Sequence, residues 1–441
     1  MAATRILIVG GGYVGMYTAL RLQRRLSRGS ADITVVEPQS NMTYQPFLPE
    51  AAAGSVEPRH VVVSLRKVLR KCNVITGAVT RITHAAKTAT IQPSEGEAYE
   101  FGYDVLVVAA GSISRLLPIP GLAERGIGFK TIGEAIYLRN HVLSRLDLAA
   151  STADPVKRRA SLTFVFVGGG YAGVEALAEL EDMARYALRY VPQLDANEMR
   201  WVLVEAASRI MPEVSVRLSA YTVDRLTERG IDVRLDTRLE SAVDGHIRLS
   251  DGESFDAETL VWTAGVKASP VLAETDLPLD DKGRLPCKAN LTVKGVTGVF
   301  SAGDCAAVPD LSKKDPNALC GPSAQHAVRQ AKVLADNVVS HVRGGALHDY
   351  EHAYVGSVAS LGLYRGVAEL YGVKVRGFPA WFLHRTYHVS RMPTLNRKVR
   401  VIADWTGALL FRREVVSLGQ LQRPHTEFQQ AAGRREFPDV S

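Results

Sequence analysis

Cysteine is scarce in this sequence of 441 residues, which contains only four. No two of them form a C-x-x-C or C-x4-C pair; they are Cys72, Cys287, Cys305 and Cys320. Their number and spacing argue against a disulfide framework, a zinc knuckle and a redox-active dithiol. Sparse, unpatterned cysteine is typical of a protein that resides in a reducing compartment.

Long apolar runs are also missing. No stretch approaches the ~18 uninterrupted apolar residues of a membrane-spanning helix, so no such helix is predicted. The first apolar run, residues 6–9, ends at three glycines and is too short for the core of a signal peptide. We therefore expect a protein that is soluble or that binds a membrane from one side.

Composition narrows the class further. With 46% hydrophobic and 22% charged residues, the chain is typical of a folded globular protein, and its length suggests two or three domains. The net charge of +7 fits a solvated basic surface or contact with an anionic membrane. Because no zinc-finger, recognition-helix or RNP pattern is present, we do not expect nucleic acid as a partner.

Two parts of the chain carry the same pattern of strand, glycines, helix and strand. The first part runs from an apolar strand at 5–9 to another at 33–37, and the second from 162–167 to 201–205. Apolar residues at consecutive positions are typical of buried parallel strands. The sequence therefore predicts an α/β fold with two Rossmann-like dinucleotide-binding domains.

The first glycine cluster forms G-x-G-x-x-G between a strand and a helix. Its glycines permit a tight turn, let the backbone approach a pyrophosphate, and let helix and strand pack closely. The acid that ends the next strand is placed to accept hydrogen bonds from a ribose. The predicted cofactor-binding residues are Gly10, Gly12, Tyr13, Val14, Gly15 and Glu37.

The second cluster repeats this motif. Glu205 favours NADH over NADPH, because a carboxylate repels a 2′-phosphate, and Arg209 could weaken that preference. More residues than usual precede Glu205, so it could instead only cap a turn. The predicted cofactor-binding residues are Gly168, Gly170, Tyr171, Gly173 and Glu205.

Two nucleotide sites imply two nucleotides, a tightly held flavin and a diffusing nicotinamide. A flavin accepts hydride directly, so the absence of a Ser/His/Asp or Cys/His pattern is expected. With these motifs the sequence resembles the two-dinucleotide-binding-domain flavoproteins, and among them the type II, non-proton-pumping NADH:quinone oxidoreductases. The resemblance covers residues 1 to about 420.

The resemblance implies FAD and NADH as cofactors and four segments. These are an FAD domain at 1–120 and 281–345, an inserted NADH domain at 121–280, and a C-terminal α/β region at 346–441 for membrane association or dimerisation. Two Ala-Gly pairs resemble short returns to the nucleotide sites, and residues 299–304 resemble a second FAD signature. The residues concerned are Ala110, Gly111, Ala264, Gly265, Gly303 and Asp304. The acid at 304 could instead only cap a helix.

Residues near the flavin also follow from the resemblance. Glu175, in a G-x-E motif, would lie near the nicotinamide and orient its carboxamide, whereas Glu179 fits a surface or domain contact. The loop 41–58 contains a stretch that resembles the segment beside the isoalloxazine ring. Its candidates are Tyr44, Gln45 and Pro46, although an aromatic residue before proline could serve loop packing alone.

The quinone prediction rests on a helix at 323–339. The family carries A-Q-x-A-x-Q-Q there, with two glutamines facing the quinone; Ala324, Gln325 and Gln330 match, but Arg329 replaces one glutamine. Arg329 only donates hydrogen bonds, so it could serve a quinone carbonyl, turn away, or favour a more polar acceptor. The predicted catalytic residues are Glu175, Gln325 and Arg329.

The C-terminal region also resembles the family, which implies a homodimer on the cytoplasmic face of the cell membrane. Residues 378–389 and 408–418 are the predicted membrane elements, though neither has a clean amphipathic stripe and dimer packing would explain the same residues. A polar tail is expected from about residue 423. Two other functions stay open, namely a soluble NAD(P)H-dependent reductase with a ferredoxin or small-molecule acceptor, and a redox sensor of the apoptosis-inducing-factor kind.

Overall fold

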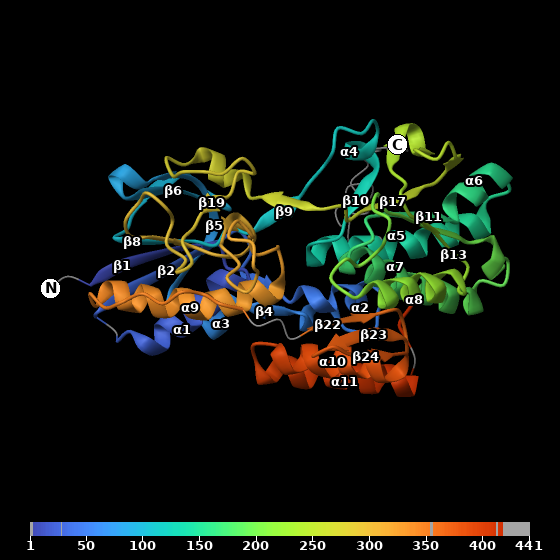
Figure 1. Ribbon diagram of the computed structural model, residues 1–441. Coiled ribbons are helices and arrows are strands. Elements are labelled where there is room, and N and C mark those ends of the chain that lie inside the picture. Colours follow the sequence, from blue (N-terminus) through green and yellow to red (C-terminus); the bar gives the residue numbers. More distant parts are fainter. Residues whose placement is uncertain (1–2, 28, 353–355, 412, 418–441) are drawn as a thin grey trace, which may run out of the picture.

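This computed structural model describes residues 3–27, 29–352, 356–411 and 413–417. Figure 1 shows two α/β lobes side by side, with α10 and α11 forming a layer beneath β22–β24. The tail predicted from residue 423 lies outside the described residues. The predicted α/β class and the pair of Rossmann-like sheets are confirmed.

The first lobe is built on a seven-stranded sheet of order β20-β8-β1-β2-β5-β6-β7. Its parallel strands are β1 (Thr4–Val9), β2 (Ala31–Glu37), β8 (Val105–Val108), β20 (Val299–Ser301) and the first part of β5 (Asn73–Thr83). The second part of β5 pairs antiparallel with β6 (Thr88–Pro93), and β6 pairs antiparallel with β7 (Tyr99–Gly102). The helices α1 (Tyr13–Arg25) and α9 (Ala324–Val342) pack together, and Arg21 and Asp336 form an ion pair between them at 2.6 Å.

The second lobe has five parallel strands in the order β10-β17-β11-β12-β13. They are β10 (Gly126–Gly128), β17 (Thr259–Trp262), β11 (Thr163–Val167), β12 (Arg200–Val204) and β13 (Ile231–Arg234). The long helices of this lobe are α5 (Ile132–Ser151), α7 (Tyr171–Ala187) and α8 (Val216–Thr227). The strand β11 is buried at every position, as its uninterrupted apolar sequence predicts.

The two chain crossings between the lobes lie side by side. The strand β9 (Ser112–Ser114) leaves the first lobe and pairs antiparallel with β18 (Val266–Ala268), which returns to it (Figure 1). The predicted domain limits at 120 and 280 remain a prediction.

Shorter elements complete the two lobes. They are α2 (Leu48–Ala52), α3 (Leu65–Val68), α4 (Leu122–Arg125), α6 (Pro155–Ser161), β3 (Asn41–Thr43), β4 (Val62–Ser64), β14 (Leu239–Ser241), β15 (His246–Leu249), β16 (Ser254–Asp256), β19 (Leu285–Pro286) and β21 (Ala306–Ala307). The prediction of a plain loop over 41–58 was wrong, because β3 and the fully buried α2 lie within it. Its prolines begin helical turns there, where a proline loses no hydrogen bond.

The C-terminal region is an antiparallel sheet followed by two helices. The strands are β22 (Gly356–Ser360), β23 (Gly366–Leu370) and β24 (Val373–Arg376), and the helices are α10 (Phe378–Arg391) and α11 (Leu395–Phe411). The first predicted membrane element, 378–389, lies within α10. The limits of the second were wrong, because α11 begins at Leu395 and ends at Phe411.

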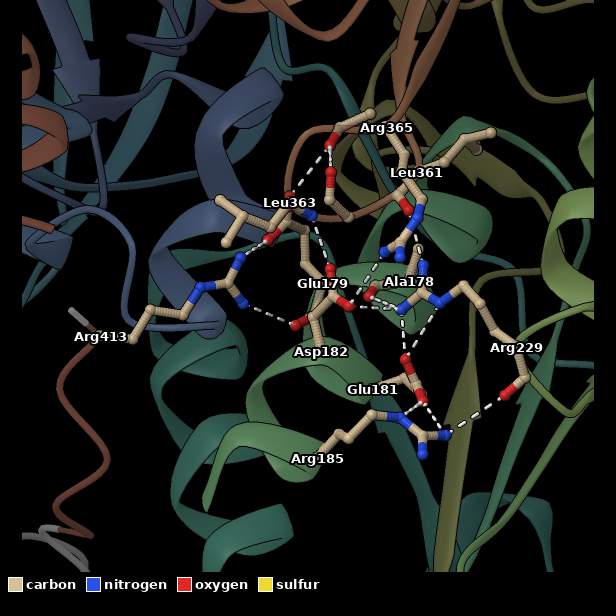
Figure 2. A network of polar contacts seen from close by, with 12 residues as sticks. Ala178, Glu179, Glu181, Asp182, Arg185, Arg229, Leu361, Leu363, Arg365 and Arg413 are labelled. Atoms are coloured by element: carbon tan, nitrogen blue, oxygen red, sulfur yellow. Dashed lines mark hydrogen bonds and ion pairs between the residues drawn. The ribbon is translucent and has the colours of Figure 1, made fainter. Parts of the chain in front are cut away.

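A buried ionic network joins α7 to this region (Figure 2). Arg229 lies between Glu181 and Asp182, and it also donates to the carbonyl oxygens of Ala178 (2.8 Å) and Leu361 (2.6 Å). Burial opposes the positive charge, but Asp182 and Glu181 hold the pKa of Arg229 above its usual value. The side chain of Glu181 is 1% exposed, so its negative charge depends on its ion pairs with Arg229 and Arg185.

Replacing Arg229 with methionine should destabilise the protein by about 3–5 kcal/mol, because it leaves buried carboxylates without their main partner. The matched control is Arg248→Met, since Arg248 pairs with Glu240 with both side chains about half exposed (59% and 46%), and such a pair contributes less than about 1 kcal/mol. Thermal and urea denaturation followed by circular dichroism measures both variants. Equal midpoints for the two would contradict a stabilising role for the network.

Candidate functional site

The two glycine motifs form nearly identical turns at the carboxyl ends of β1 and β11. Gly10 and Gly168 have φ of +101° and +113°, a conformation that favours glycine. A Cβ at Gly15 would lie 1.8 Å from Gly10 O, and one at Gly173 would lie 2.0 Å from Gly168 O. The first and third glycines therefore perform the tight turn and the close helix packing that their spacing predicts.

The middle glycines leave space at two helix N-termini. A Cβ built on Gly12 or Gly170 meets no atom within 4 Å. Both are N-cap residues without side-chain capping, and Tyr13 and Tyr171 are the first residues of α1 and α7. Free N–H groups at a helix N-terminus bind anions. Each turn thus fits the diphosphate of a dinucleotide.

The two strand-end acids occupy equivalent positions. Gly11 N–H donates to Glu37 Oε2 at 2.6 Å, and Gly169 N–H donates to Glu205 Oε2 at 2.6 Å. Burial raises the pKa of Glu37, although the Gly11 N–H acts against this shift. The spacing before Glu205 is unusual because α7 is longer than α1 and, above all, because the segment 188–199 that links α7 to β12 is long. Both carboxylates lie beside their glycine turns with oxygen lone pairs left for a ribose.

Arg209 is engaged elsewhere. Its guanidinium donates to the carbonyl oxygens of Pro212 at 2.6 Å and Val214 at 3.4 Å. These contacts direct Arg209 to the backbone of its own loop and favour a site governed by the charge of Glu205.

The Ala-Gly segments lie against the glycine turns. A Cβ on Gly10 would lie 2.3 Å from Ala109 O, directly before Ala110 and Gly111. In the second lobe, Thr263 Oγ1 donates to Gly168 O at 3.0 Å, directly before Ala264 and Gly265. Gly111 and Gly265 both have positive φ, +65° and +90°, so both turn the chain sharply at the strand end.

The second FAD signature is packed between α1 and α9. Gly303 has φ +74°, and a Cβ there would lie 2.8 Å from Val14 Cγ2. Its N–H donates to Gln330 Oε1 at 2.8 Å. Gln330 therefore positions this turn from within α9.

Asp304 belongs to a small polar cluster that the sequence did not reveal. Ser112 donates to Asp304 Oδ2 at 2.6 Å, and Lys130 Nζ lies 2.5 Å from Ser112 Oγ and 3.9 Å from Asp304 Oδ2. Burial lowers the pKa of Lys130, opposed by Asp304. The carboxylate of Asp304 accepts a hydrogen bond from Ser112 and does not cap a helix. Ser112 directly follows the Ala110-Gly111 segment, which could have indicated it as a site residue. Lys130 lies between β10 and α5, where no sequence motif marks it.

The loop with Tyr44, Gln45 and Pro46 lies beside the first motif, because Gln45 N–H donates to Tyr13 Oη at 3.1 Å. Tyr44 is 3% exposed and its hydroxyl donates to the carbonyl oxygen of His388 on α10 at 3.0 Å. Tyr44 thus performs the loop packing that was the alternative for this segment. Gln45 is exposed and Pro46 half-buried.

Gln325 and Arg329 lie together near the start of α9, whose first residue is Ala324. Gln325 Nε2 donates to Gly356 O at 3.0 Å, and Arg329 Nη1 donates to Gln325 Oε1 at 3.2 Å. Arg329 also lies 2.8 Å from His352 Nδ1. Burial and Arg329 lower the pKa of His352 to about 4, so His352 is neutral and can accept from Arg329. Arg329 is held by Gln325 and His352.

Glu175 is 7% exposed and faces the C-terminal region. Ser360 N–H donates to Glu175 Oε1 at 2.8 Å, and His384 Nε2 lies 3.1 Å from the same oxygen. Burial disfavours the cation of His384, but Glu175 and Glu50 outweigh it and raise the pKa of His384. No sequence motif predicts that Glu175 on α7 pairs with His384 on α10.

The other acids of this layer are paired too. Glu179 is fully buried and accepts from Ser360 Oγ and Arg413 Nη2, both at 2.9 Å, which makes it the predicted domain contact. Glu50 on α2 accepts from Trp405 Nε1 at 2.7 Å.

Comparisons with known proteins agree with this geometry. A family model described as pyridine nucleotide-disulphide oxidoreductase matches residues 4–331. The type II NADH:quinone oxidoreductase Ndh of Mycobacterium tuberculosis is 28% identical over 424 residues, 93% of this chain and 89% of the relative. The type II NADH:quinone oxidoreductase of Staphylococcus aureus is 29% identical over 392 residues, 86% of this chain and 93% of the relative.

Among solved structures, NDH2 of Plasmodium falciparum in complex with NADH has the same fold. Its TM-score is 0.84 at 17% identity, and the match covers 94% of this chain and 99% of that chain. Because the family model covers most of its length, this chain belongs to the pyridine nucleotide-disulphide oxidoreductase family.

Proposed function

We propose that this protein is a type II NADH:quinone oxidoreductase, which oxidises NADH and reduces a membrane quinone without pumping protons. The observation that carries the proposal is the pair of matching nucleotide turns, each with its acid, in a chain similar over most of its length to enzymes of that name.

The first site holds FAD. The N-terminus of α1 at Gly12 would hold its diphosphate, Glu37 would bind a ribose, and the turn at Gly303 and Asp304 would close the site from the side of α9. When bound, FAD supplies the redox chemistry, accepting a hydride from NADH and passing two electrons to quinone.

The second site holds NADH at the N-terminus of α7. Gly170 leaves room for the diphosphate, and the carboxylate of Glu205 binds the ribose and rejects the 2′-phosphate of NADPH. Arg209 donates to backbone carbonyl oxygens, so it does not offset this preference.

The quinone end of the site lies between α9 and β22. Gln325 bonds to Gly356 at the start of β22, and Glu175 bonds to Ser360 at its end. Arg329, which lies beside Gln325, would donate to a quinone oxygen. Quinone reduction consumes protons, and the Glu175–His384 pair holds one at the buried end of this strand.

The surface of the protein that binds the membrane is formed by α11. No helix among the described residues is long and apolar enough to cross a bilayer. Because α11 begins at Leu395, it carries an exposed apolar stripe at helical spacing, formed by Leu395, Val399, Ile402 and Leu409, with exposures of 75%, 57%, 48% and 62%. Lys398 and Arg400 flank it, as in helices that lie on anionic membranes. The protein binds the inner face of the cell membrane and forms a homodimer.

The proposal is tested by adding NADH to the FAD-loaded protein without oxygen, and then a short-chain quinone. We expect fast bleaching of the flavin and fast recovery. Arg329→Gln should speed only the recovery, because it restores the family's amide, while Lys332→Gln, an equal charge change on an exposed position of the same helix, should change neither step. Slow recovery with every quinone would favour a ferredoxin reductase or a redox sensor.

Two glycine variants separate the nucleotide sites. Gly12→Val should abolish FAD retention, whereas Gly170→Val should keep FAD and raise the KM for NADH by at least ~10-fold, because each side chain takes the place of one diphosphate. Neither residue has a protein neighbour that a Cβ would meet, so both variants should fold. Flavin absorbance after gel filtration and steady-state kinetics measure the two effects. A yellow Gly12→Val protein would exclude this FAD site.

Membrane binding is tested with Val399→Glu/Ile402→Glu and anionic vesicles in a sedimentation assay. Losing two apolar contacts should weaken binding by at least ~10-fold. Val216→Glu, at a residue of α8 that is 70% exposed, is the control. If the double variant binds vesicles normally but becomes monomeric, the stripe is a dimer interface and the membrane assignment is wrong.

A further inference from the structure

Three side chains with metal-binding atoms converge beside α9 and have no role in the proposed reaction. They are Asp310, Cys320 and His326, whose ligand atoms all lie within 4.8 Å of one another. Asp310 and Cys320 are 7% and 8% exposed, and His326 is half-buried. A carboxylate, a thiol and an imidazole together are typical ligands of a transition metal, whereas a cluster of carboxylates alone offers only oxygen ligands.

Backbone hydrogen bonds hold these residues in place. Asp310 N–H donates to Ala318 O at 2.8 Å, and Cys320 N–H donates to Val308 O at 2.9 Å, so the ends of this loop are tied together. His326 stands in the first turn of α9, where its N–H donates to the capping hydroxyl of Ser323 at 3.1 Å. The backbone positions of all three side chains are thus set before any ion binds, which lowers the cost of assembling a site.

A buried tyrosine orients the imidazole. His326 Nδ1 lies 2.9 Å from Tyr350 Oη, and Tyr350 is 2% exposed. A hydrogen bond from Nδ1 leaves Nε2 as the ligand atom. Metal-binding histidines usually have such an outer partner on the second ring nitrogen, which fixes the tautomer and the ring direction.

The other contacts of Asp310 leave its carboxylate able to bind a metal ion. Its Oδ1 accepts from Ser312 Oγ at 2.6 Å, and its Oδ2 lies 3.5 Å from Lys313 Nζ, whose side chain is 59% exposed. An exposed lysine can move into solvent at little cost, so Oδ2 is available. Zinc–ligand distances of about 2.0–2.3 Å require the three donor atoms to close to roughly 4 Å or less, which side-chain rotation supplies.

We propose that Asp310, Cys320 and His326 bind one Zn²⁺ ion, with the fourth position open to water. The sulfur and nitrogen donors favour zinc over Mg²⁺ and Ca²⁺, which prefer sets of oxygen ligands. No ligand spacing in the sequence indicates this site, because its ligands come from a loop and a helix that meet only in the fold. The site lies beside Gln330 and His352, with the ring centroids of His326 and His352 4.7 Å apart, but its binding of a metal ion does not depend on the proposed reaction.

The test uses the full-length protein with FAD bound, stripped with a chelator and dialysed against Zn²⁺, with bound metal measured by mass spectrometry. We expect one Zn²⁺ per chain. Cys320→Ser and His326→Ala should each weaken binding by at least ~10-fold, and Tyr350→Phe should weaken it by roughly 10-fold through the outer partner. Cys72→Ser is the matched control and should bind normally, because Cys72 lies outside the cluster.

Co²⁺ gives a second measurement. Tetrahedral coordination that includes the thiolate should produce visible d–d bands at wavelengths beyond the flavin absorption, and these bands should vanish in Cys320→Ser. Flavin content and thermal midpoint without metal show whether each variant folds. Absence of Zn²⁺ from the wild-type protein at micromolar concentrations, or equal binding by Cys320→Ser, would overturn the proposal.

Discussion

The arrangement of the C-terminal region depends on buried acids on α7. Glu175, Glu179 and Glu181 are each at most 7% exposed, and a buried carboxylate without a cation costs several kcal/mol. Their partners come from three different places, His384 on α10, Arg413 after α11 and Arg229 after α8. Each pairing therefore restricts where a separate part of the chain can lie.

The same helix begins at the second nucleotide turn, so these ion pairs connect that turn to the layer formed by α10 and α11. Between them lies β22, whose first residue bonds to Gln325 from the first lobe and whose last residue bonds to Glu175 from the second. A strand hydrogen-bonded at both ends cannot shift without breaking one of the two contacts. This geometry keeps Gln325 of α9, a predicted quinone residue, in a fixed relation to α7.

Sequence reasoning succeeded where local chemistry determines the structure. The close approach of Gly15 to Gly10 O excludes any side chain, so the motif itself reports the turn, and the repeat of that motif placed Glu205 despite its unusual spacing. It failed where long-range packing decides. Tyr44 points inward because its hydroxyl bonds to α10, which the sequence did not indicate. The apolar stripe on α11 was missed because the helix begins at Leu395, earlier than the predicted element at 408.

The pairs that no motif marks have the same cause. Lys130 meets Asp304, and His384 meets Glu175, across distances in sequence that no periodicity reports. A lone charged residue in a sequence is usually a solvated one, so the burial of both His384 and Glu175 is information that only the fold supplies.

The two nucleotide turns are alike, but the segments that surround them differ. The first turn is covered by segments from three distant parts of the chain, namely the loop at Gln45, the turn at Gly303 and helix α9. Releasing a molecule there requires these contacts to open together. Beside the second turn lie the segment ending in Gly265, which β18 links to the crossing between the lobes, and Met211, whose N–H donates to Gly169 O at 2.7 Å. Equal diphosphate cradles can therefore differ greatly in residence time, because dissociation depends on how many packed elements must move.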